Sequence, residues 1–441
     1  MIRTIHFICL GCPKNRVDAE MQADLALTEG FTPTAEPLEA EVIVVNTCAF
    51  IEEARRESID TILEIAEAKI QGRCRNLIVT GCMAERYETE LISELPEVDH
   101  VIGLGRLEAL REALSGRNPS SRRRILFPSR VHGRMLDGPG HTAYLKIGEG
   151  CSRRCAFCAI PSIRGRGLSR SSRSILDEAR RLAASGVREL NLVSQDTSAY
   201  GRDLSPRTDL ASLVARLARI RKLDWIRLLY LYPDRSVLDL VPLLAEDPRV
   251  LPYVDLPLQH VTDRMLGLMR RGHGRRHVER LVTTLRRRVP GLTLRTTFIV
   301  GHPGETDDDF AALLEFIETH RPERIGLLRY SREEGTAAAR MSPKVPPRTS
   351  YGRFRKAAAL ARRVLGEHNR SLAGSRAEAL VEGPSISGPY LFDARLASQA
   401  PEVDGKTIVA KSGRVLAPGE IVPVRIRRAL GEDLLADLDE A

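Results

Sequence analysis

Three cysteines lie close together near the middle of the chain. The stretch reads Cys-Ser-Arg-Arg-Cys-Ala-Phe-Cys, with Cys151, Cys155 and Cys158, and no further cysteine follows. A structural zinc site normally has four protein ligands, whereas closely spaced thiolates also hold cubane iron–sulfur clusters. A cubane held by three cysteines leaves one iron without a protein ligand. The spacing therefore predicts a cluster that can bind a substrate or cofactor at that iron.

Three more cysteines each follow a predicted β-strand in the first part of the chain. They are Cys12, Cys48 and Cys82. If these strands are parallel, their carboxyl ends meet at one edge of a sheet, where ligands bind. The pattern predicts a second three-cysteine site; the alternative is three unrelated buried thiols. Cys9 falls within a strand and Cys74 within a polar turn, and both are interpreted as structural.

The composition limits the class of protein. With 441 residues, two or three domains are expected. No apolar run is long enough to span a membrane, and the first strand is too short to be a secretory signal. All eight cysteines lie within the first 158 residues. Without a signal peptide, metal or redox use is predicted in place of disulfides. We therefore expect a cytoplasmic protein that contacts no membrane.

Alternating strands and helices predict a doubly wound parallel sheet over residues 1–115. A second set of alternating elements predicts a partial parallel barrel of six β/α units over 137–368, with functional groups at the strand ends. After a basic helical stretch at 348–370, short β-type runs predict a small antiparallel barrel of the oligonucleotide-binding kind over 371–437. The predicted strands of the first part are 2–8, 42–45, 77–80 and 98–102. Those of the second part are 144–147, 189–193, 225–231, 253–256, 294–300 and 324–328. Those of the third part are 378–381, 407–410 and 421–426.

An arginine-rich linker, 116–136, separates the first two parts. It contains six arginines and no acidic residue. Such a patch can approach RNA phosphates; a solvated basic linker is the equally weighted alternative. The arginines are Arg117, Arg122, Arg123, Arg124, Arg130 and Arg134.

Several motifs resemble the radical S-adenosylmethionine (SAM) methylthiotransferases along essentially the whole chain. Leu-Gly-Cys-Pro-Lys-Asn at 10–15, Asn-Thr-Cys-Ala-Phe-Ile at 46–51 and Thr-Gly-Cys at 80–82 resemble the first domain of that family. The run at 151–158 matches the radical SAM motif, and the terminal barrel is similar to a TRAM domain.

Three further motifs indicate which family members are most similar. They are Phe-Cys-Ala-Ile-Pro-Ser-Ile-Arg-Gly at 157–165, Arg-Leu-Leu-Tyr-Leu-Tyr-Pro at 227–233 and Leu-Pro-Leu-Gln-His at 256–260. With the motif at 10–15, they resemble members that modify small-subunit ribosomal protein S-twelve. The tRNA-modifying members usually carry Tyr-Gly-Cys-Gln-Met-Asn at the first motif. His302 departs from the pattern, because phenylalanine is usual there.

The resemblance implies two 4Fe-4S clusters and SAM as cofactors. Cys151, Cys155 and Cys158 would hold the cluster whose open iron binds SAM, and reductive cleavage would give a 5′-deoxyadenosyl radical. Cys12, Cys48 and Cys82 would hold an auxiliary cluster that carries the sulfur. The product would be a methylthio group on the β-carbon of an aspartate. No catalytic residue is expected beyond the cluster ligands. The expected SAM contacts are Phe157, Gln195, Asp196, Val300, Gly301, Gly304 and Glu305. The alternative is that these residues belong to an ordinary turn and to polar loops, where the same residue types occur.

The terminal barrel helps to distinguish protein from RNA as the substrate. From 371 to 441 there are eight Lys or Arg and eleven Asp or Glu, a net charge of −3, and the aromatics are Tyr390 and Phe392. An RNA-binding barrel should have a basic groove and stacking aromatics, so a basic ribosomal protein is favoured. The expected partners are ribosomal protein S-twelve, free or in the small subunit, and an electron donor such as flavodoxin or ferredoxin. Ribosomal RNA is a further expected contact. The alternatives are a tRNA adenosine methylthiotransferase, a non-catalytic iron–sulfur electron carrier and a zinc-bound RNA-binding module.

Overall fold

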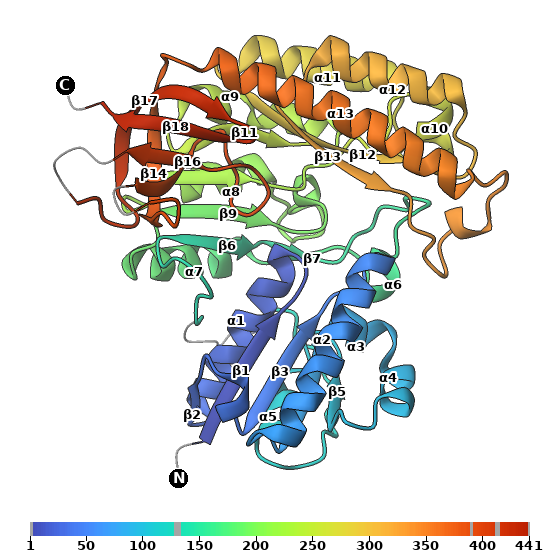
Figure 1. The fold of residues 1–441 in the computed structure, drawn as a ribbon, viewed down its shortest axis with the longest axis vertical. Coiled ribbons are helices and arrows are strands. Elements are labelled where there is room, and N and C mark those ends of the chain that lie inside the picture. Colours follow the sequence, from blue (N-terminus) through green and yellow to red (C-terminus); the bar gives the residue numbers. More distant parts are fainter. Residues whose placement is uncertain (1–2, 128–133, 389–390, 411–414, 440–441) are drawn as a thin grey trace.

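The computed structural model describes residues 3–127, 134–388, 391–410 and 415–439. Arg130 of the linker and Tyr390 of the terminal barrel lie outside these residues. Figure 1 shows three parts, with the first domain in blue, the central domain from teal to orange and the terminal barrel in red. In the described residues no helix is long and apolar enough to cross a membrane.

The first domain is a parallel five-stranded sheet with helices on both faces, as expected. The strand order is β2-β1-β3-β4-β5, an arrangement typical of doubly wound folds. Every residue of β3 is buried, because helices cover both sides of the sheet. The short strand β2 was not predicted. The strands are β1 (Arg3–Cys9), β2 (Phe31–Pro33), β3 (Val42–Thr47), β4 (Asn76–Gly81) and β5 (His100–Ile102).

Two clusters of buried apolar side chains pack the helices of the first domain against its sheet. One layer joins Ala26 of α1 and Leu110 of α5 to Val44 of β3. The other joins Ile62 of α2 and Leu91 of α4 to Val45 of β3. Tyr87 separates the short helices α3 and α4. The helices are α1 (Pro13–Thr28), α2 (Glu52–Gln71), α3 (Cys82–Arg86), α4 (Glu88–Glu94) and α5 (Leu107–Leu114).

The central domain confirms the predicted partial barrel. Its six parallel strands run in the order β13-β12-β11-β10-β9-β6, which is the reverse of the chain order. Strand β10 is shorter than predicted, because Tyr230 has φ 60°, outside the β region. The strands are β6 (Thr142–Lys146), β9 (Glu189–Val193), β10 (Trp225–Leu228), β11 (Val250–Asp255), β12 (Thr293–Val300) and β13 (Arg324–Arg329).

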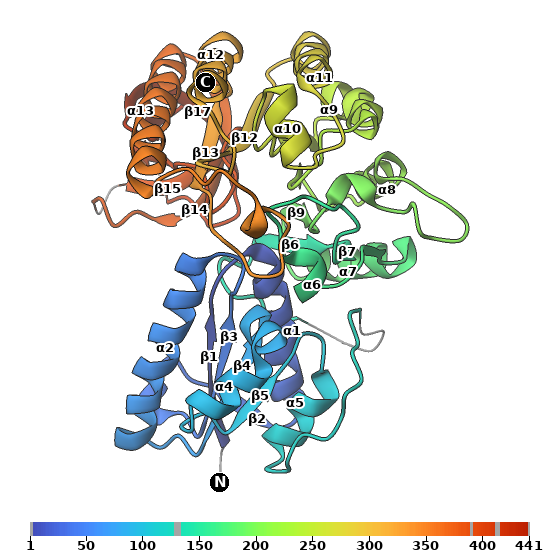
Figure 2. The same cartoon turned by 90° about the vertical axis from the view of Figure 1, so that its right-hand side faces the viewer.

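Helices cover the outer face of this sheet, and Figure 2 shows them around the upper half of the molecule. They are α7 (Ser172–Ala184), α8 (Leu210–Leu217), α9 (Val241–Glu246), α10 (Asp263–Leu268), α11 (Arg275–Arg288), α12 (Asp307–His320) and α13 (Pro347–Ser371). A small antiparallel pair that was not predicted, β7 (Gly148–Glu149) and β8 (Leu168–Ser169), flanks the cysteine stretch and the short helix α6 (Ile160–Ile163).

The terminal domain is a closed five-stranded barrel in the order β14-β15-β16-β18-β17. Four pairings are antiparallel, as expected, and β16 pairs with β18 in parallel. Strands β15 and β18 were not predicted. The guanidinium of Arg395 pairs with buried Glu189 of the central sheet, which ties the barrel to that sheet. The strands are β14 (Arg376–Pro384), β15 (Leu391–Leu396), β16 (Thr407–Ala410), β17 (Ile421–Leu430) and β18 (Asp433–Leu438).

Candidate active site between two cysteine loops

The structure brings Cys12, Cys48 and Cys82 to one edge of the first sheet. They follow β1, β3 and β4, which are adjacent strands of the same direction. A Cβ atom built on Gly11, where φ is +96°, would lie 2.7 Å from Cβ of Cys48. The loop of Cys12 therefore passes directly over Cys48, and this close approach requires glycine. The Sγ atom of Cys82 lies 3.5 Å from Oδ1 of Asn15, in the first turn of α1.

Positive groups surround this triad. Burial raises the pKa of Cys82 to about 12, and the Arg164 guanidinium opposes that shift. Burial would also raise the pKa of Cys12, but Lys14, Arg164 and the backbone N–H groups of Asn15 and Lys14 hold it below its ordinary value. Thiols must be deprotonated before they bind iron. The cations favour the thiolate of Cys12 and partly offset the effect of burial on the pKa of Cys82.

The second triad lies in the loop between β7 and α6. The backbone N–H of Arg153 donates to Sγ of Cys151 at 3.4 Å, and the Arg271 guanidinium donates to Sγ of Cys155 at 3.3 Å. Burial raises the pKa of Cys158 to about 12. Donors aimed at sulfur suit iron-bound thiolates, because hydrogen bonds to the sulfurs tune iron–sulfur clusters.

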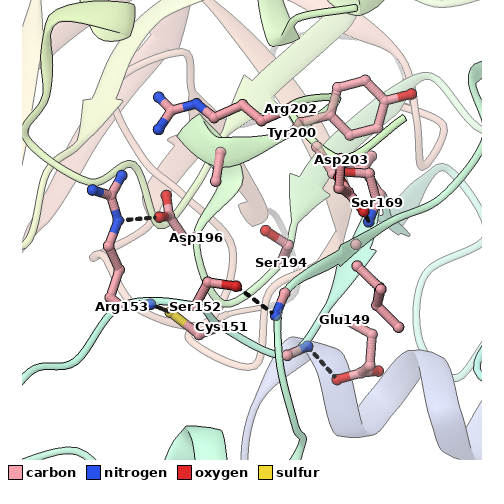
Figure 3. Close-up of a pocket in the computed structure, with 16 residues that line it drawn as sticks. Glu149, Cys151, Ser152, Arg153, Ser169, Ser194, Asp196, Tyr200, Arg202 and Asp203 are labelled. Carbon is pink, nitrogen blue, oxygen red and sulfur yellow. Dashed lines mark hydrogen bonds and ion pairs between the residues drawn. The ribbon is translucent and has the colours of Figure 1, made fainter. Parts of the chain in front are cut away.

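A pocket of about 250 Å³, lined by both apolar and charged residues, adjoins Cys151. Figure 3 shows the Arg153 side chain pointing to Asp196, with Nε 2.7 Å from the carboxylate. The Ser152 hydroxyl accepts a hydrogen bond from the backbone N–H of Gly167 at 3.2 Å. These contacts fix the cysteine loop against the end of β9.

Neither triad is arranged around a single metal ion. Across the described ranges, no three His, Cys, Asp or Glu side chains are placed to hold one ion together.

Arg164 joins the surroundings of both triads, although the sequence did not single it out. Its side chain is 1% exposed and donates to Glu149 at 2.8 Å and to Asp18 at 3.2 Å. It also hydrogen-bonds Oδ1 of Asn15. Lys146 donates to Glu149 at 2.9 Å. Asn15 lies in the motif at 10–15 and Arg164 in the motif at 157–165. Their places in these motifs are the sequence feature that could have indicated a functional role.

The expected SAM contacts lie at the same end of the central barrel. Phe157 packs against an apolar cluster that includes Met265, Met269 and Ile299. Its ring meets His302 edge to face, with centroids 6.4 Å apart. Gln195 donates to Glu149 at 2.9 Å, while its Oε1 is buried with no hydrogen-bond partner among the described residues. A buried acceptor without a partner suits a polar contact with a cofactor.

Four of the seven expected contacts have other partners in the structure. The carboxylate of Asp196 is occupied by Arg153 and Ser198. Val300 is part of the apolar core. A Cβ on Gly301, where φ is +78°, would lie 2.1 Å from Oγ of Ser350 in α13, so a protein contact already requires that glycine.

The fourth, Glu305, is also engaged within the protein. Its carboxylate accepts from the backbone N–H of Gly301 at 2.8 Å and from Arg353 at 2.6 Å. Glu305 therefore positions the turn after β12. Gly304, with φ +83°, lies in the same turn, and a Cβ atom built on it would lie 3.0 Å from Cδ1 of Leu268.

The arginine-rich linker is partly neutralised by the protein itself. Arg122 pairs with Glu88, Arg124 lies 3.6 Å from Glu85, and Arg134 pairs with Glu20 and Glu178. The Arg134 side chain is only 4% exposed. Arg123 remains exposed. The linker therefore offers less free positive charge than its sequence implies.

Comparisons with known proteins place the chain in a family. Three family models match: Uncharacterized protein family UPF0004 at 4–103, Radical SAM superfamily at 145–317 and TRAM domain at 373–438. The chain is 47% identical to "Ribosomal protein uS12 methylthiotransferase RimO" of Sorangium cellulosum (strain So ce56), covering 99% of this chain and 91% of the relative. It is 44% identical to the protein of that name from Myxococcus xanthus (strain DK1622), covering 99% and 92%.

A solved structure supports the fold. The radical S-adenosylmethionine methyltransferase TsrM from Kitasatospora setae, with cobalamin and a [4Fe-4S] cluster bound, aligns with a TM-score of 0.52 at 15% identity. The alignment covers 88% of this chain and 82% of that chain. Neither the sequence relatives nor this solved structure favours a four-ligand electron carrier or a zinc module. The chain belongs to the RimO family of ribosomal protein uS12 methylthiotransferases, within the radical SAM superfamily.

Proposed function

We propose that this chain adds a methylthio group to the β-carbon of an aspartate in small-subunit ribosomal protein uS12. The observation that carries the proposal is the buried network of Arg164, which contacts Asn15 beside one cysteine triad and Glu149 beside the other. The names of the curated relatives support the substrate.

Each triad has its own role in the proposal. Cys151, Cys155 and Cys158 hold the radical SAM cluster, and Cys12, Cys48 and Cys82 hold the auxiliary cluster. When bound, the two 4Fe-4S clusters and two molecules of SAM supply the radical and the methylthio group. The chain's own residues orient these groups and exclude water. Phe157, Gln195 and Glu305 are the expected SAM contacts that keep a free face, or a buried oxygen without a hydrogen bond to the described residues.

Protein remains the favoured substrate over tRNA. Five of the eight basic side chains of the terminal domain pair with carboxylates of this chain, which reduces the positive charge that they offer to phosphates. The pairs are Arg376 with Asp439, Arg395 with Glu189 and Glu382, Lys406 with Asp393, Arg425 with Asp439, and Arg427 with Asp437. A TRAM domain is also consistent with an RNA contact, and the ribosome offers RNA beside uS12. Arg123 of the linker is the exposed residue best suited to that contact.

A basic pocket beside the second triad suits the electron donor. It has a volume of about 530 Å³ and includes Arg154, Arg235 and Arg270. These three side chains are exposed and form no ion pair with described residues. The same pocket includes Arg271, which reaches Cys155. Flavodoxin or ferredoxin, if acidic, would be attracted electrostatically to this surface.

The chain's cysteines and its division into parts agree with this role. All eight cysteines are free, which suits the reducing cytoplasm, where ribosomes are made. We assign 1–115 to the auxiliary cluster, 116–136 to the linker, 137–368 to the radical chemistry and 371–437 to docking of the target.

Mass spectrometry of uS12 and of tRNA, from cells with and without this protein, tests the proposal. A mass increase for replacement of hydrogen by a methylthio group is expected on a uS12 aspartate, and only in cells with the protein. Expression of Cys12→Ala should not restore it, whereas Cys74→Ala, outside both triads, should. A methylthio group on tRNA adenosine, with uS12 unmodified, would establish the tRNA enzyme instead.

A further inference from the structure

Helix α13 presents two rows of basic side chains on the face that is turned away from the protein core. The members of each row are seven residues apart, which is about two helical turns, so they lie on the same side of the helix. All six side chains are exposed. We call this surface the basic face of α13. Its residues are Arg348, Arg355 and Arg362 in one row and Lys356, Arg363 and Arg370 in the other.

The opposite face of α13 is apolar and is already covered by the protein. Ala357, Leu360 and Val364 are buried in the core of the central domain. A helix that binds a membrane surface inserts its apolar side into the lipid. Because that side of α13 is buried against the central domain, only the charged side can meet a partner, and a lipid surface fits it poorly.

Most of the basic face has no counter-charge within the protein. Arg363 pairs with Glu318 of α12 at 2.6 Å and lies 3.9 Å from Glu367. Glu367 is the one acidic residue of α13, and it also pairs with Arg321. The other five cations form no ion pair with any residue whose position the structure describes. They are therefore available to an anionic partner.

Helix α13 connects the candidate active site to the terminal domain. Near its start, Arg353 donates to the Glu305 carboxylate, in the turn after β12, at 2.6 Å. Near its end, the Asn369 side chain donates to the carbonyls of Gly431 and Glu432 at 3.2 and 3.1 Å, between β17 and β18. Figure 1 shows the helix in orange, on the outside of the central domain and reaching towards the red barrel. A partner that lies along α13 would thus be held beside both parts.

We infer that the basic face of α13 binds phosphates of ribosomal RNA beside uS12 in the small subunit. This inference rests on the proposed function, because uS12 is what brings the protein to the ribosome. Each row places cations about 10 Å apart, and the face is about 33 Å long, which suits a polyanion better than a single charged group. Tyr351, which is 53% exposed and lies between Arg348 and Arg355 on the same side, can stack on an unpaired base.

This contact would make the assembled subunit a better target than free uS12. Arg123 of the linker adds one exposed cation, whereas α13 adds a row of them. Transfer RNA carries the same phosphates, but it has no uS12 to be modified. The choice between ribosomal RNA and tRNA is therefore decided by measuring both.

The affinity of the anaerobically reconstituted protein for purified small ribosomal subunits, measured at several salt concentrations, tests the inference. The triple variant Arg355→Gln, Lys356→Gln, Arg362→Gln should bind subunits roughly tenfold more weakly or worse at about 0.1 M salt. The slope of log affinity against log salt should become smaller by about two to three, since about one unit is lost per phosphate contact. Affinity for a peptide of the uS12 target region should not change. Arg355→Lys with Arg362→Lys should keep subunit binding, because the charges remain.

A variant of α11 is the matched control. Arg276→Gln, Arg280→Gln, Arg287→Gln removes the same charge from exposed positions of another helix, and it should bind subunits as wild type does. Equal weakening by this variant would overturn the inference, because overall charge would then be responsible. Equal weakening by Arg123→Gln alone would overturn it in favour of the linker. Wild-type affinity for tRNA equal to that for the subunit would also overturn it.

Turnover separates this inference from the proposed function. If the triple variant of α13 modifies uS12 in assembled subunits as efficiently as wild type, the inference fails and the proposed function stands. If subunit binding follows the prediction but wild-type protein leaves uS12 unmodified, the proposed function fails and the docking surface on α13 stands.

Discussion

The Arg164 guanidinium hydrogen-bonds the side-chain oxygen of Asn15, a residue 149 positions earlier in the chain. Asn15 follows Cys12 in the first domain, and Arg164 follows Cys158 in the central domain. One hydrogen bond therefore joins the loops of both cysteine triads. The relative position of the triads depends on this contact and on the ion pair of Arg164 with Asp18 of α1.

Replacement of Arg164 should destabilise the junction of the two domains. Arg164→Gln leaves Glu149 and Asp18 with one cation fewer in a buried site, and breaking a buried ion pair costs about 3–5 kcal/mol. Thermal and denaturant unfolding would measure the loss. Arg180→Gln removes an ion pair whose arginine side chain is 60% exposed, so a change below about 1 kcal/mol is expected. Equal stability of the two variants would show that the network is not a structural link.

The cysteine triads should be separable by their chemistry. Reconstituted wild-type protein should hold about eight irons, from two four-iron clusters. Cys155→Ala should abolish formation of 5′-deoxyadenosine, whereas Cys48→Ala should retain it and lose methylthio transfer. Each variant should hold about four irons, because one cluster remains. Cys74→Ala, in the apolar core of the first domain, should behave as wild type. Normal turnover by Cys48→Ala would remove the auxiliary assignment.

Stability should depend on pH through Glu189. Burial alone would raise its pKa, but Arg395 and Arg227 lower it from 4.5 to about 2. Since the pKa is lower in the folded protein, the stabilisation is fully present above about pH 4.5 and is lost as the pH falls towards 2. The shift corresponds to about 3 kcal/mol.

Denaturant unfolding of Glu189→Gln would measure that contribution. The variant should be less stable at pH 7 by roughly 3 kcal/mol, and its stability should fall less between pH 4.5 and 2. Glu246→Gln, at an exposed position, should change stability by less than about 0.5 kcal/mol. Parallel pH profiles for wild type and Glu189→Gln would contradict the assignment.

The basic pocket should matter for reduction by a protein donor. Arg235→Glu reverses a charge at the pocket and should slow reduction by flavodoxin about tenfold at low salt, with the difference shrinking as salt screens it. Reduction by dithionite, which needs no docking, isolates the effect. Arg207→Glu, an exposed residue outside the pocket, is the matched control. If both variants slow flavodoxin equally, overall charge and not the pocket is responsible.

Much of the fold follows from local sequence patterns. The continuous apolar run of β3 and the helical spacing of apolar residues in α11 can be recognised in the sequence. Six strand–helix repeats predict the partial barrel. The elements that were not predicted are short or depend on neighbours. Strand β2 has only three residues, and β15 and β18 contain acidic residues that the barrel pairs with basic ones, Asp393 with Lys406 and Asp437 with Arg427.

The sequence by itself determined the six cysteines, their two groups and the family, because spacing and motif order are properties of the chain. Only the tertiary structure decided that Glu305 and Gly301 serve a turn, that Arg164 joins both triads, and that Lys14 is buried against Tyr230. The physical reason is that burial and pairing depend on residues far apart in sequence. An arginine has the same formal charge in any sequence, but only its surroundings decide which carboxylates it pairs with.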